Sequence, residues 1–369
     1  MKSNDNQKAF FALVKAGLWG QECRLLPFGG IDFKEVYRIA EEQSVVGLVA
    51  AGLEHVVDVK APKEDMLQFV GQALLFEKMN QAMNKFVAVL VDKLRKEGVY
   101  SLLLKGQGVA QCYARPLWRA CGDVDLFLSE DNYIKAKAVL TTMASNVEDE
   151  NEFTKHIGMT IYSWEVELHG SLRSELYSKI DRGLDKIKDD IFFGGTVRSW
   201  QNGQTQVFLP GANNDAVYIF THILQHFFKG GIGLRQICDW CRMLWTYKDT
   251  LDCVLLERRI REMGLMSEWK AFGALAVNSL GMPVEAMPFY DTRYKIKGEK
   301  VLAFVLETGN FGQNRDMSFR QESVTFSRKW KMFLHITSDT IKQFSIFPLD
   351  SIRVWYGMMV VGLKSLVGR

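Results

Sequence analysis

Hydrophobic residues recur at helical spacing near the start of the chain. Residues 33–53 are apolar at this spacing, and Pro62 with the acidic residues after it opens a long periodic segment that ends at Gly98. The apolar side chains of that segment fall on one predicted helical face, so we expect the segment to pack along its length. They are Met66, Phe69, Val70, Ala73, Leu74, Met79, Met83, Phe86, Val87, Leu90, Val91 and Leu94.

Helical spacing returns in the second half of the chain. It covers residues 215–228, 234–247 and 255–280. Residues 283–330 mix proline, glycine, charged and aromatic residues without a clear period, and we assign no structure to them. The apolar run 354–363 is about half of the ~20 residues that a membrane span needs, which favours a buried or interfacial helix.

Between these parts the pattern is that of short strands. Residues 99–104 are a brief apolar run near glycines, residues 123–128 alternate between polar and apolar positions, and residues 164–169 alternate again. A helix start is expected at 109–113. The pattern predicts an α+β chain, mostly helical, with a small mixed sheet. We divide it into an N-terminal helical region (1–97), a core with the sheet (98–205) and a C-terminal helical region (206–369).

Composition narrows the class of protein. The chain has 369 residues, of which 47% are hydrophobic and 24% charged, and this excludes disorder and fibrous repeats. A net charge of +3 gives no attraction of the whole molecule to nucleic acid, so a small-molecule partner is favoured slightly. The six cysteines are scattered and the N-terminus is a poor secretory signal, which indicates reduced thiols and a cytoplasmic protein.

Two alternating strands carry the candidate chemistry. Asp123 and Asp125 share one face of a strand because residues two apart project together. Two adjacent carboxylates repel each other unless a cation offsets them, and such a pair suits Mg²⁺. Glu165, Glu167 and His169 share a face of the later strand, and either glutamate can add a third carboxylate. Three acids with two bridged metal ions are a known arrangement for phosphoryl chemistry.

A predicted phosphate site precedes the acidic pair. Lys105 and Gly106 lie where a strand gives way to a helix. Glycine lets backbone amides approach a phosphate closely, the helix start adds its positive dipole end, and the lysine supplies a point charge. The pattern indicates a triphosphate site.

The histidines and cysteines of the C-terminal region have weaker signals. His222 and His226 are four apart on a predicted helix, but no glutamate between them completes a zinc-protease motif, so packing or a nucleotide-facing role is favoured. Cys238 and Cys241 lack a second pair at zinc-site spacing and are interpreted as core thiols. His169, at a strand end, is interpreted first as structural and second as a partner of the acids.

Charged residues of the C-terminal region can likewise have either a structural or a ligand-binding role. Arg235 and Asp239 lie one turn apart, which predicts an ion pair, with a nucleotide contact from Arg235 as the alternative. The basic clusters at 295–297 and 328–331 are interpreted as solvated faces, and the second is also a candidate contact for an anionic acceptor or a membrane surface.

Taken together, these motifs resemble the signature of a known family. The matching residues are Leu104-Lys105-Gly106, Tyr113, Pro116, Arg119, the run from Gly122 to Leu126, and Glu167-Leu168-His169. They resemble the uncharacterised bacterial nucleotidyltransferase family, which belongs to the DNA polymerase β-like superfamily. That family has Lys-Gly where the wider superfamily usually has Gly-Ser, and its third acid precedes Leu-His. The family pattern also favours Glu167 over Glu165.

The resemblance implies transfer of a nucleoside monophosphate from an NTP to an acceptor hydroxyl, with release of pyrophosphate. Two Mg²⁺ ions are expected. Residue by residue, it implies metal ligands and catalytic residues at Asp123, Asp125 and Glu167; phosphate binding by Lys105, Gly106 and Gln107; and a phosphate or carboxylate contact from Arg119. Arg235 and His222 are added as nucleotide-binding candidates. The acceptor, the base and the oligomeric state are left open. The alternatives are an inactive nucleotide-binding or scaffold protein on the same fold and, less favoured, an RNA-modifying enzyme.

Overall fold

The N-terminal part of the chain is helical, as its apolar periodicity predicts. The computed structural model describes residues 2–312, 314 and 325–367, with side chains described for 5–310, 312, 314 and 333–360. The elements before the first strand are α1 (Lys2–Trp19), the 3-10 turn η1 (Leu26–Phe28), α2 (Phe33–Glu42), α3 (Val46–Leu53) and α4 (Lys63–Lys96). The periodic segment 33–53 is thus two helices, separated where Ser44 adopts a left-handed conformation with φ of 55°.

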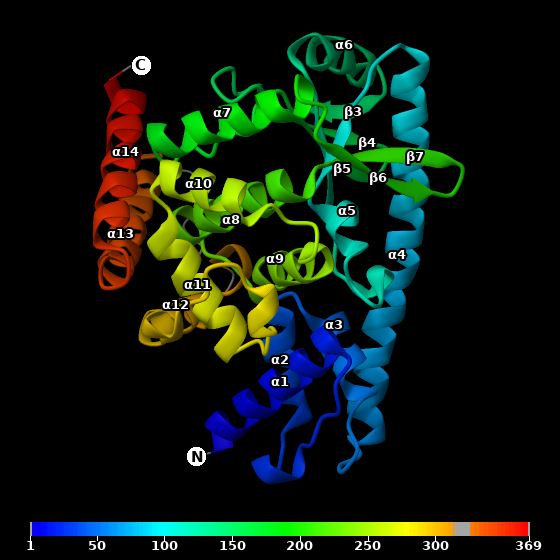
Figure 1. Cartoon of the computed structure of the whole chain (residues 1–369), viewed down its shortest axis with the longest axis vertical. Helices are drawn as coiled ribbons and strands as arrows, with labels where there is room; N and C mark the ends of the chain where they lie inside the picture. Colours follow the sequence, from blue (N-terminus) through cyan, green and yellow to red (C-terminus); the bar gives the residue numbers. More distant parts are fainter. Residues whose placement is uncertain (1, 313, 315–324, 368–369) are drawn as a thin grey trace.

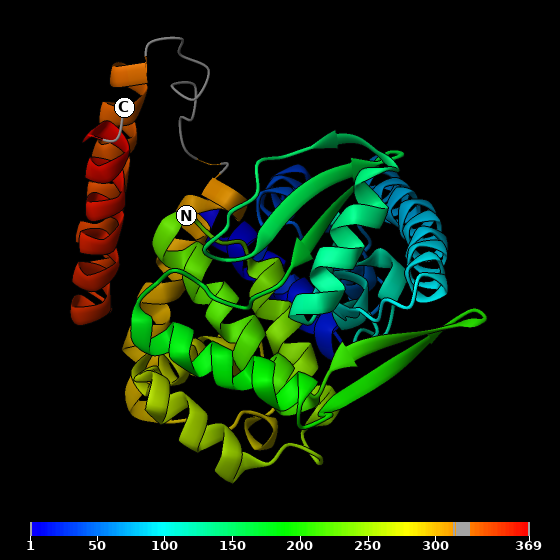
Figure 2. The same ribbon diagram turned by 90° about the horizontal axis from the view of Figure 1, so that it is seen from above.

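Helix α4 starts and ends where the sequence predicts. Pro62 precedes its first residue, and Gly98, with φ of 71°, follows its C-terminal end. Most of the predicted apolar face is buried, but Val70, Leu74 and Met79 are exposed, so the prediction of packing along the full length is wrong at these positions. Helix α4 runs along one edge of the molecule in Figure 1 and is seen nearly end-on at an edge in Figure 2.

Seven strands form one mixed sheet in the described part of the chain, in the order β3-β4-β5-β2-β1-β7-β6. Strands β2 and β5, and β1 and β7, are parallel, and the other neighbours are antiparallel. The α+β class and the mixed sheet are therefore confirmed. The strands are β1 (Leu102–Leu104), β2 (Asp123–Phe127), β3 (Ala144–Val147), β4 (His156–Ile161), β5 (Trp164–His169), β6 (Val197–Asn202) and β7 (Thr205–Pro210).

Four of these strands were not predicted. The sequence indicated β1, β2 and β5, whereas β3 and β4 lie in the stretch between β2 and β5, and β6 and β7 form a hairpin before the C-terminal helices. The short helix α5 (Gly106–Ala110) starts directly after Lys105, earlier than the predicted 109–113. Strand β1 thus passes into a helix at the predicted phosphate site.

Each face of the sheet packs on a different set of helices. Val124 and Leu126 of β2, with Val166 and Leu168 of β5, belong to a buried cluster that includes side chains of α4 and α6 (Glu130–Thr141). Phe127 faces the other way and belongs to a larger cluster with the N-terminal and C-terminal helices. The acidic positions of β2 and β5 alternate with the first set and therefore face the C-terminal helices. The division of the chain into three regions stays a prediction.

The C-terminal half supplies the helices over the acidic face. After α7 (Ser178–Phe192) come α8 (Ala212–Lys229), α9 (Leu234–Tyr247), α10 (Cys253–Met263), α11 (Met266–Asn278), α12 (Lys295–Thr308), α13 (Thr325–Phe344) and α14 (Pro348–Val367), with 3-10 turns η3 (Val284–Ala286), η4 (Thr292–Tyr294) and η5 (Asn310–Gly312). Residues 255–280 are two helices because Gly264 is left-handed, with φ of 78°. Within the unassigned stretch 283–330, the described residues include α12. None of the described helices has the length and apolar character needed to span a membrane.

The sequence analysis interpreted two basic clusters, 295–297 and 328–331, as solvated faces, and the structure describes side chains for the first of them. Lys295 is exposed at the start of α12, whereas Lys297 is half-buried, donates to Ser267 Oγ at 2.8 Å and lies over the Phe347 ring. The solvated interpretation is therefore wrong for Lys297. The second cluster, 328–331, lies in α13, but its side chains are outside those that the structure describes. Helices α13 and α14 lie side by side at the edge opposite α4 (Figure 2).

A buried glutamate beside α14 should make stability depend on pH. Burial raises the pKa of Glu268 from 4.5 to about 8, and the charge of Asp350 at the start of α14 adds to the rise. Because the folded protein holds this proton more tightly than the unfolded chain, the stabilisation is full below pH 4.5 and is lost as the pH rises through about 8. We expect the melting temperature, followed by circular dichroism, to fall across this window.

Glu268→Gln should flatten the dependence, because the amide cannot ionise. Glu285→Gln, at an exposed glutamate, is the matched control and should keep the wild-type profile. Lys297 and Tyr177 also lie near Glu268, and the pKa values of both are shifted. The pH profiles of the wild type and of Glu268→Gln should therefore be compared over the same pH range. Equal profiles for the wild type and Glu268→Gln would contradict the assignment.

Candidate active site

The turn after β1 places a lysine over the acidic strand. Lys105 and Gly106 are both left-handed, with φ of 46° and 41°. A non-glycine residue held in this region costs about 1 to 3 kcal/mol, so the surrounding structure must hold the turn in place. The Lys105 side chain is 17% exposed, and its Nζ lies 3.1 Å from Asp125 Oδ1. The turn thus directs its cation onto the buried aspartate.

Three carboxylates meet beside this lysine. Parallel pairing sets Asp125 of β2 opposite Glu167 of β5. One carboxylate oxygen from each of Asp123, Asp125 and Glu167 lies within 4.8 Å of the others. Glu165 lies opposite Asp123, but it is exposed, accepts a hydrogen bond from Thr160 Oγ1 at 3.0 Å and is not part of this group. The geometry thus gathers Glu167, and not Glu165, with the two aspartates.

The charges of these groups suit a divalent cation. The negative charge of Asp125 is the main cause that raises the pKa of Asp123. Burial lowers the pKa of Lys105, but the charge of Asp125 and other acidic neighbours raises it above its ordinary value overall. Hard carboxylate oxygens at this spacing are ligands that Mg²⁺ prefers, so the residues fit the predicted metal.

Arg119 lies in the cavity wall with its donors already in use. Its Nε and Nη2 donate to Oδ1 and Oδ2 of Asp239 at 2.8 and 2.6 Å, and its Nη1 donates to Ala120 O and approaches Cys121 Sγ. Tyr113 also donates to Asp239, at 2.8 Å. In this structure Arg119 contacts none of the three carboxylates, and its predicted phosphate contact stays a prediction.

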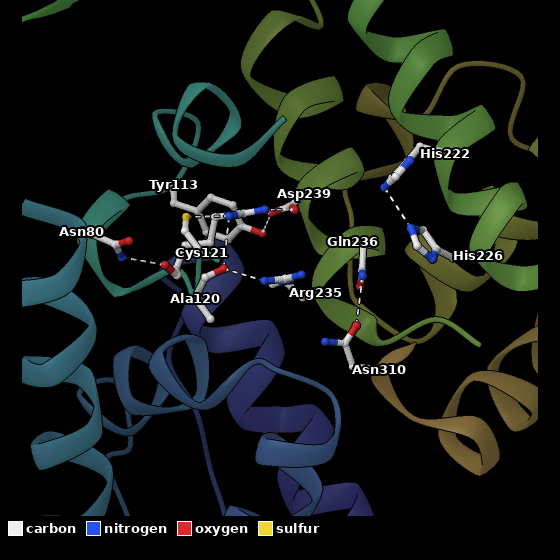
Figure 3. Close-up of polar contacts among 11 residues, drawn as sticks. Asn80, Tyr113, Ala120, Cys121, His222, His226, Arg235, Gln236, Asp239 and Asn310 are labelled. Carbon is white, nitrogen blue, oxygen red and sulfur yellow. Dashed lines mark hydrogen bonds and ion pairs between the residues drawn. The ribbon is translucent and has the colours of Figure 1, made fainter. Parts of the chain in front are cut away.

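Arg235 does not form the predicted ion pair with Asp239, because Arg119 takes that carboxylate. Its Nη1 donates to Ala120 O at 2.8 Å, and its Nε is buried without a hydrogen-bond partner among the described residues (Figure 3). The side chain lines the same cavity as Lys105 and Asp123. An arginine with a spare donor in a polar cavity suits an anionic ligand.

His222 and His226 face each other across one turn of α8. Their Nε2 atoms lie 3.0 Å apart, and both residues line the cavity (Figure 3). Burial is the main cause that lowers both pKa values, that of His226 to about 4. Both imidazoles are therefore neutral near pH 7. Cys238 and Cys241 are buried and free of disulfides, in agreement with the core interpretation.

The side chain of Gln107 points away from the cavity. Its Nε2 donates to Asn80 Oδ1 of α4 at 2.9 Å, and the residue is 1% exposed. The predicted phosphate contact of Gln107 therefore concerns its backbone amide and not its side chain. Gly106 belongs to the cavity lining.

A cavity of about 450 Å³ opens beside the three acids. Besides the predicted residues, its lining includes Tyr218 of α8, Arg173 and His156. His156 was not among the predicted site residues, although the residues around it have the alternating pattern of a strand. His156, Gly158 and Thr160 alternate with Ile157, Met159 and Ile161, which is the pattern of a half-buried strand.

Comparison with known proteins gives one match. The model of a family described as uncharacterised nucleotidyltransferase matches residues 29–280, which include every strand and the cavity's acidic residues. No curated protein and no solved structure showed a significant similarity. Since the match covers well over half of the chain, this protein belongs to the uncharacterised nucleotidyltransferase family.

Proposed function

We propose that this protein is a Mg²⁺-dependent enzyme that transfers a nucleoside monophosphate from an NTP to an acceptor hydroxyl. The observation that carries the proposal is the convergence of Asp123, Asp125 and Glu167 at a cavity beside Lys105. Family membership supports an NTP as the donor. The acceptor, a small molecule or a protein, has to fit the space beside the acids.

Asp123, Asp125 and Glu167 would hold two Mg²⁺ ions, which when bound neutralise phosphate charge. The acceptor oxygen forms a bond to the α-phosphorus, the bond from that phosphorus to the β-phosphate oxygen breaks, and pyrophosphate leaves. Burial raises the pKa of Glu167, but hydrogen bonds from His156 and His169 lower it below its ordinary value overall, so the carboxylate is ionised before the reaction. It would accept the hydroxyl proton as the new bond forms and release it to solvent. Catalysis then consists mainly of positioning and charge neutralisation.

Lys105 and Arg235 are the cations that would bind the triphosphate. In this structure Lys105 contacts Asp125, so a bound metal ion would free it to contact the β and γ phosphates. Arg235 lines the cavity from α9, and its guanidinium charge would attract the phosphates. The backbone amides of Gly106 and Gln107, at the start of α5, add donors. His222 lines the wall near these groups and would contact the nucleotide.

Arg235→Gln should weaken NTP binding. A hydrogen bond to a charged group contributes about 1.5 to 3 kcal/mol, which corresponds to a rise in Kd of roughly ten- to a hundredfold. Isothermal titration with a non-hydrolysable NTP and Mg²⁺ measures the change. Arg173→Gln is the matched control, because Arg173 lines the same cavity but pairs with Asp185 at 2.7 Å. Equal losses in both variants would remove Arg235 from the proposed phosphate site.

The function is tested by pyrophosphate release. The purified protein is incubated with each NTP, Mg²⁺ and a mixture of metabolites or proteins, and labelled nucleotide is followed into products. Transfer with at least one acceptor is the expected result. NTP binding without release of pyrophosphate under any condition would instead support an inactive nucleotide-binding protein.

A further inference from the structure

A second group of possible metal ligands lies next to the three acids. Antiparallel pairing sets His156 of β4 opposite His169 of β5, and Glu167 lies two residues before His169 on the same face. The potential ligand atoms of His156, Glu167 and His169 all lie within 4.8 Å of one another. Two imidazoles and one carboxylate thus meet at the wall of the cavity.

Nε2 of each imidazole lies close to the same carboxylate oxygen. Nε2 of His156 lies 3.2 Å from Glu167 Oε2, and Nε2 of His169 lies 3.4 Å from that same atom. Ligand atoms that share one ion at bond lengths of about 2.0 to 2.2 Å are themselves roughly 3 to 3.5 Å apart. The two nitrogen-to-oxygen spacings therefore match edges of a coordination polyhedron, and the two imidazole nitrogens lie within 4.8 Å of each other.

His169 is hydrogen-bonded to Asp125 and lies beside Glu167 as well. Its Nε2 lies 2.9 Å from Asp125 Oδ1 as well as 3.4 Å from Glu167 Oε2. A single N–H group cannot point well at two acceptors at once. An ion held between the carboxylates would take the place of the hydrogen bond to Asp125 and would bind the Nε2 lone pair of the neutral imidazole.

The composition of the group selects a kind of ion. Mg²⁺ prefers oxygen ligands, whereas imidazole nitrogen suits Zn²⁺, Fe²⁺ and related ions. Two histidines and one glutamate, with a remaining position open to solvent, are a ligand set found in catalytic zinc sites. The side chains of His156 and Glu167 are 32% and 35% exposed, so an ion can enter from the cavity.

We propose that His156, Glu167 and His169 bind a divalent transition-metal ion of the zinc type, beside the Mg²⁺ site and joined to it through Glu167. The acidic group consists of Asp123, Asp125 and Glu167, so Glu167 is common to both groups. One ion would then have only oxygen ligands from the protein, and its neighbour mainly nitrogen ligands. Nucleotide transfer is not required for this proposal, because metal binding is measured without NTP.

Cobalt is the probe, because Co²⁺ replaces Zn²⁺ and absorbs visible light. The full-length protein, freed of metal with a chelator, is titrated with Co²⁺ alone, and the absorption bands are recorded. We expect one bound Co²⁺ with nitrogen-ligand bands, displaced by Zn²⁺ but not by excess Mg²⁺. His156→Ala should weaken Co²⁺ binding at least about tenfold and shift the bands.

Two further variants make the result decisive. Asp123→Asn changes the acidic group only and should keep the bands, and His55→Gln, at a histidine outside the group, should also keep them. Absence of Co²⁺ binding, or bands that persist in His156→Ala but vanish in Asp123→Asn, would overturn the proposal. A protein that transfers nucleotides but gives either of those results would refute this site alone and leave the proposed function standing.

Discussion

Asp125→Asn should abolish most nucleotide transfer while the protein remains folded. The Asp125 carboxylate is 2% exposed and lies within reach of Lys105, His169 and the other two acids. Loss of its charge removes a ligand shared by both proposed Mg²⁺ ions, and removal of one preorganised electrostatic contact commonly costs about a hundred- to a thousandfold in kcat. Pyrophosphate release in single turnover, with the acceptor found by screening, measures the loss.

Glu165→Gln is the matched control for this experiment. Glu165 occupies the same face of the same sheet, but it is exposed and bonded to Thr160, outside the acidic group. Its replacement should leave kcat almost unchanged, since Glu165 belongs neither to the acidic group nor to the cavity lining. If Glu165→Gln lost as much activity as Asp125→Asn, the assignment of Glu167 as the third acid would be wrong.

Asp239→Ala should be the most destabilising of the variants considered. It leaves the Arg119 guanidinium, whose side chain is 7% exposed, without its carboxylate partner. Breaking a buried ion pair by removing one partner costs about 3 to 5 kcal/mol because the remaining charge stays buried. Tyr113 loses its acceptor as well. Urea unfolding followed by fluorescence gives the change in the free energy of unfolding.

Glu257→Ala provides the comparison on the surface. The Glu257 carboxylate pairs with Arg261 at 2.7 Å, but the two side chains are 42% and 62% exposed, so a loss of only about 0 to 1 kcal/mol is expected. The double variant Arg119→Met with Asp239→Leu should recover much of the loss, because no charge is left buried. A similar small loss in Asp239→Ala and Glu257→Ala would contradict the structural role given to Arg119.

The sequence predicted the parts of the site that depend on local periodicity. Asp123 and Asp125 share a face because strands have a period of two, and the Lys105 turn follows from a strand that meets a glycine. Their closeness to Glu167 depends on β2 and β5 being parallel neighbours, a long-range pairing that no local pattern contains.

A contact between distant parts of the chain explains why the predicted ion pair between Arg235 and Asp239 is wrong. Arg235 and Asp239 have the right spacing for an ion pair within α9, yet Arg119 reaches Asp239 from a distant loop with two well-aligned donors. A bidentate contact in a buried place outweighs a single-turn pair on a helix, which contributes only about 0.2 to 0.5 kcal/mol. The spacing of residues within a helix cannot predict a contact with a residue as distant in the sequence as Arg119. Strand β3 is hard to predict because three of its four residues are exposed and leave no alternating pattern, whereas β4 does alternate and was not predicted.

The contact between Lys105 and Asp125 gives the resting protein an internal counter-ion. The ammonium group offsets part of the repulsion among the three carboxylates without any divalent ion. In the proposed reaction, binding of metal and triphosphate would make Lys105 exchange partners, from a carboxylate to a phosphate. The cost of releasing the lysine from Asp125 would then favour donors that carry negative charge.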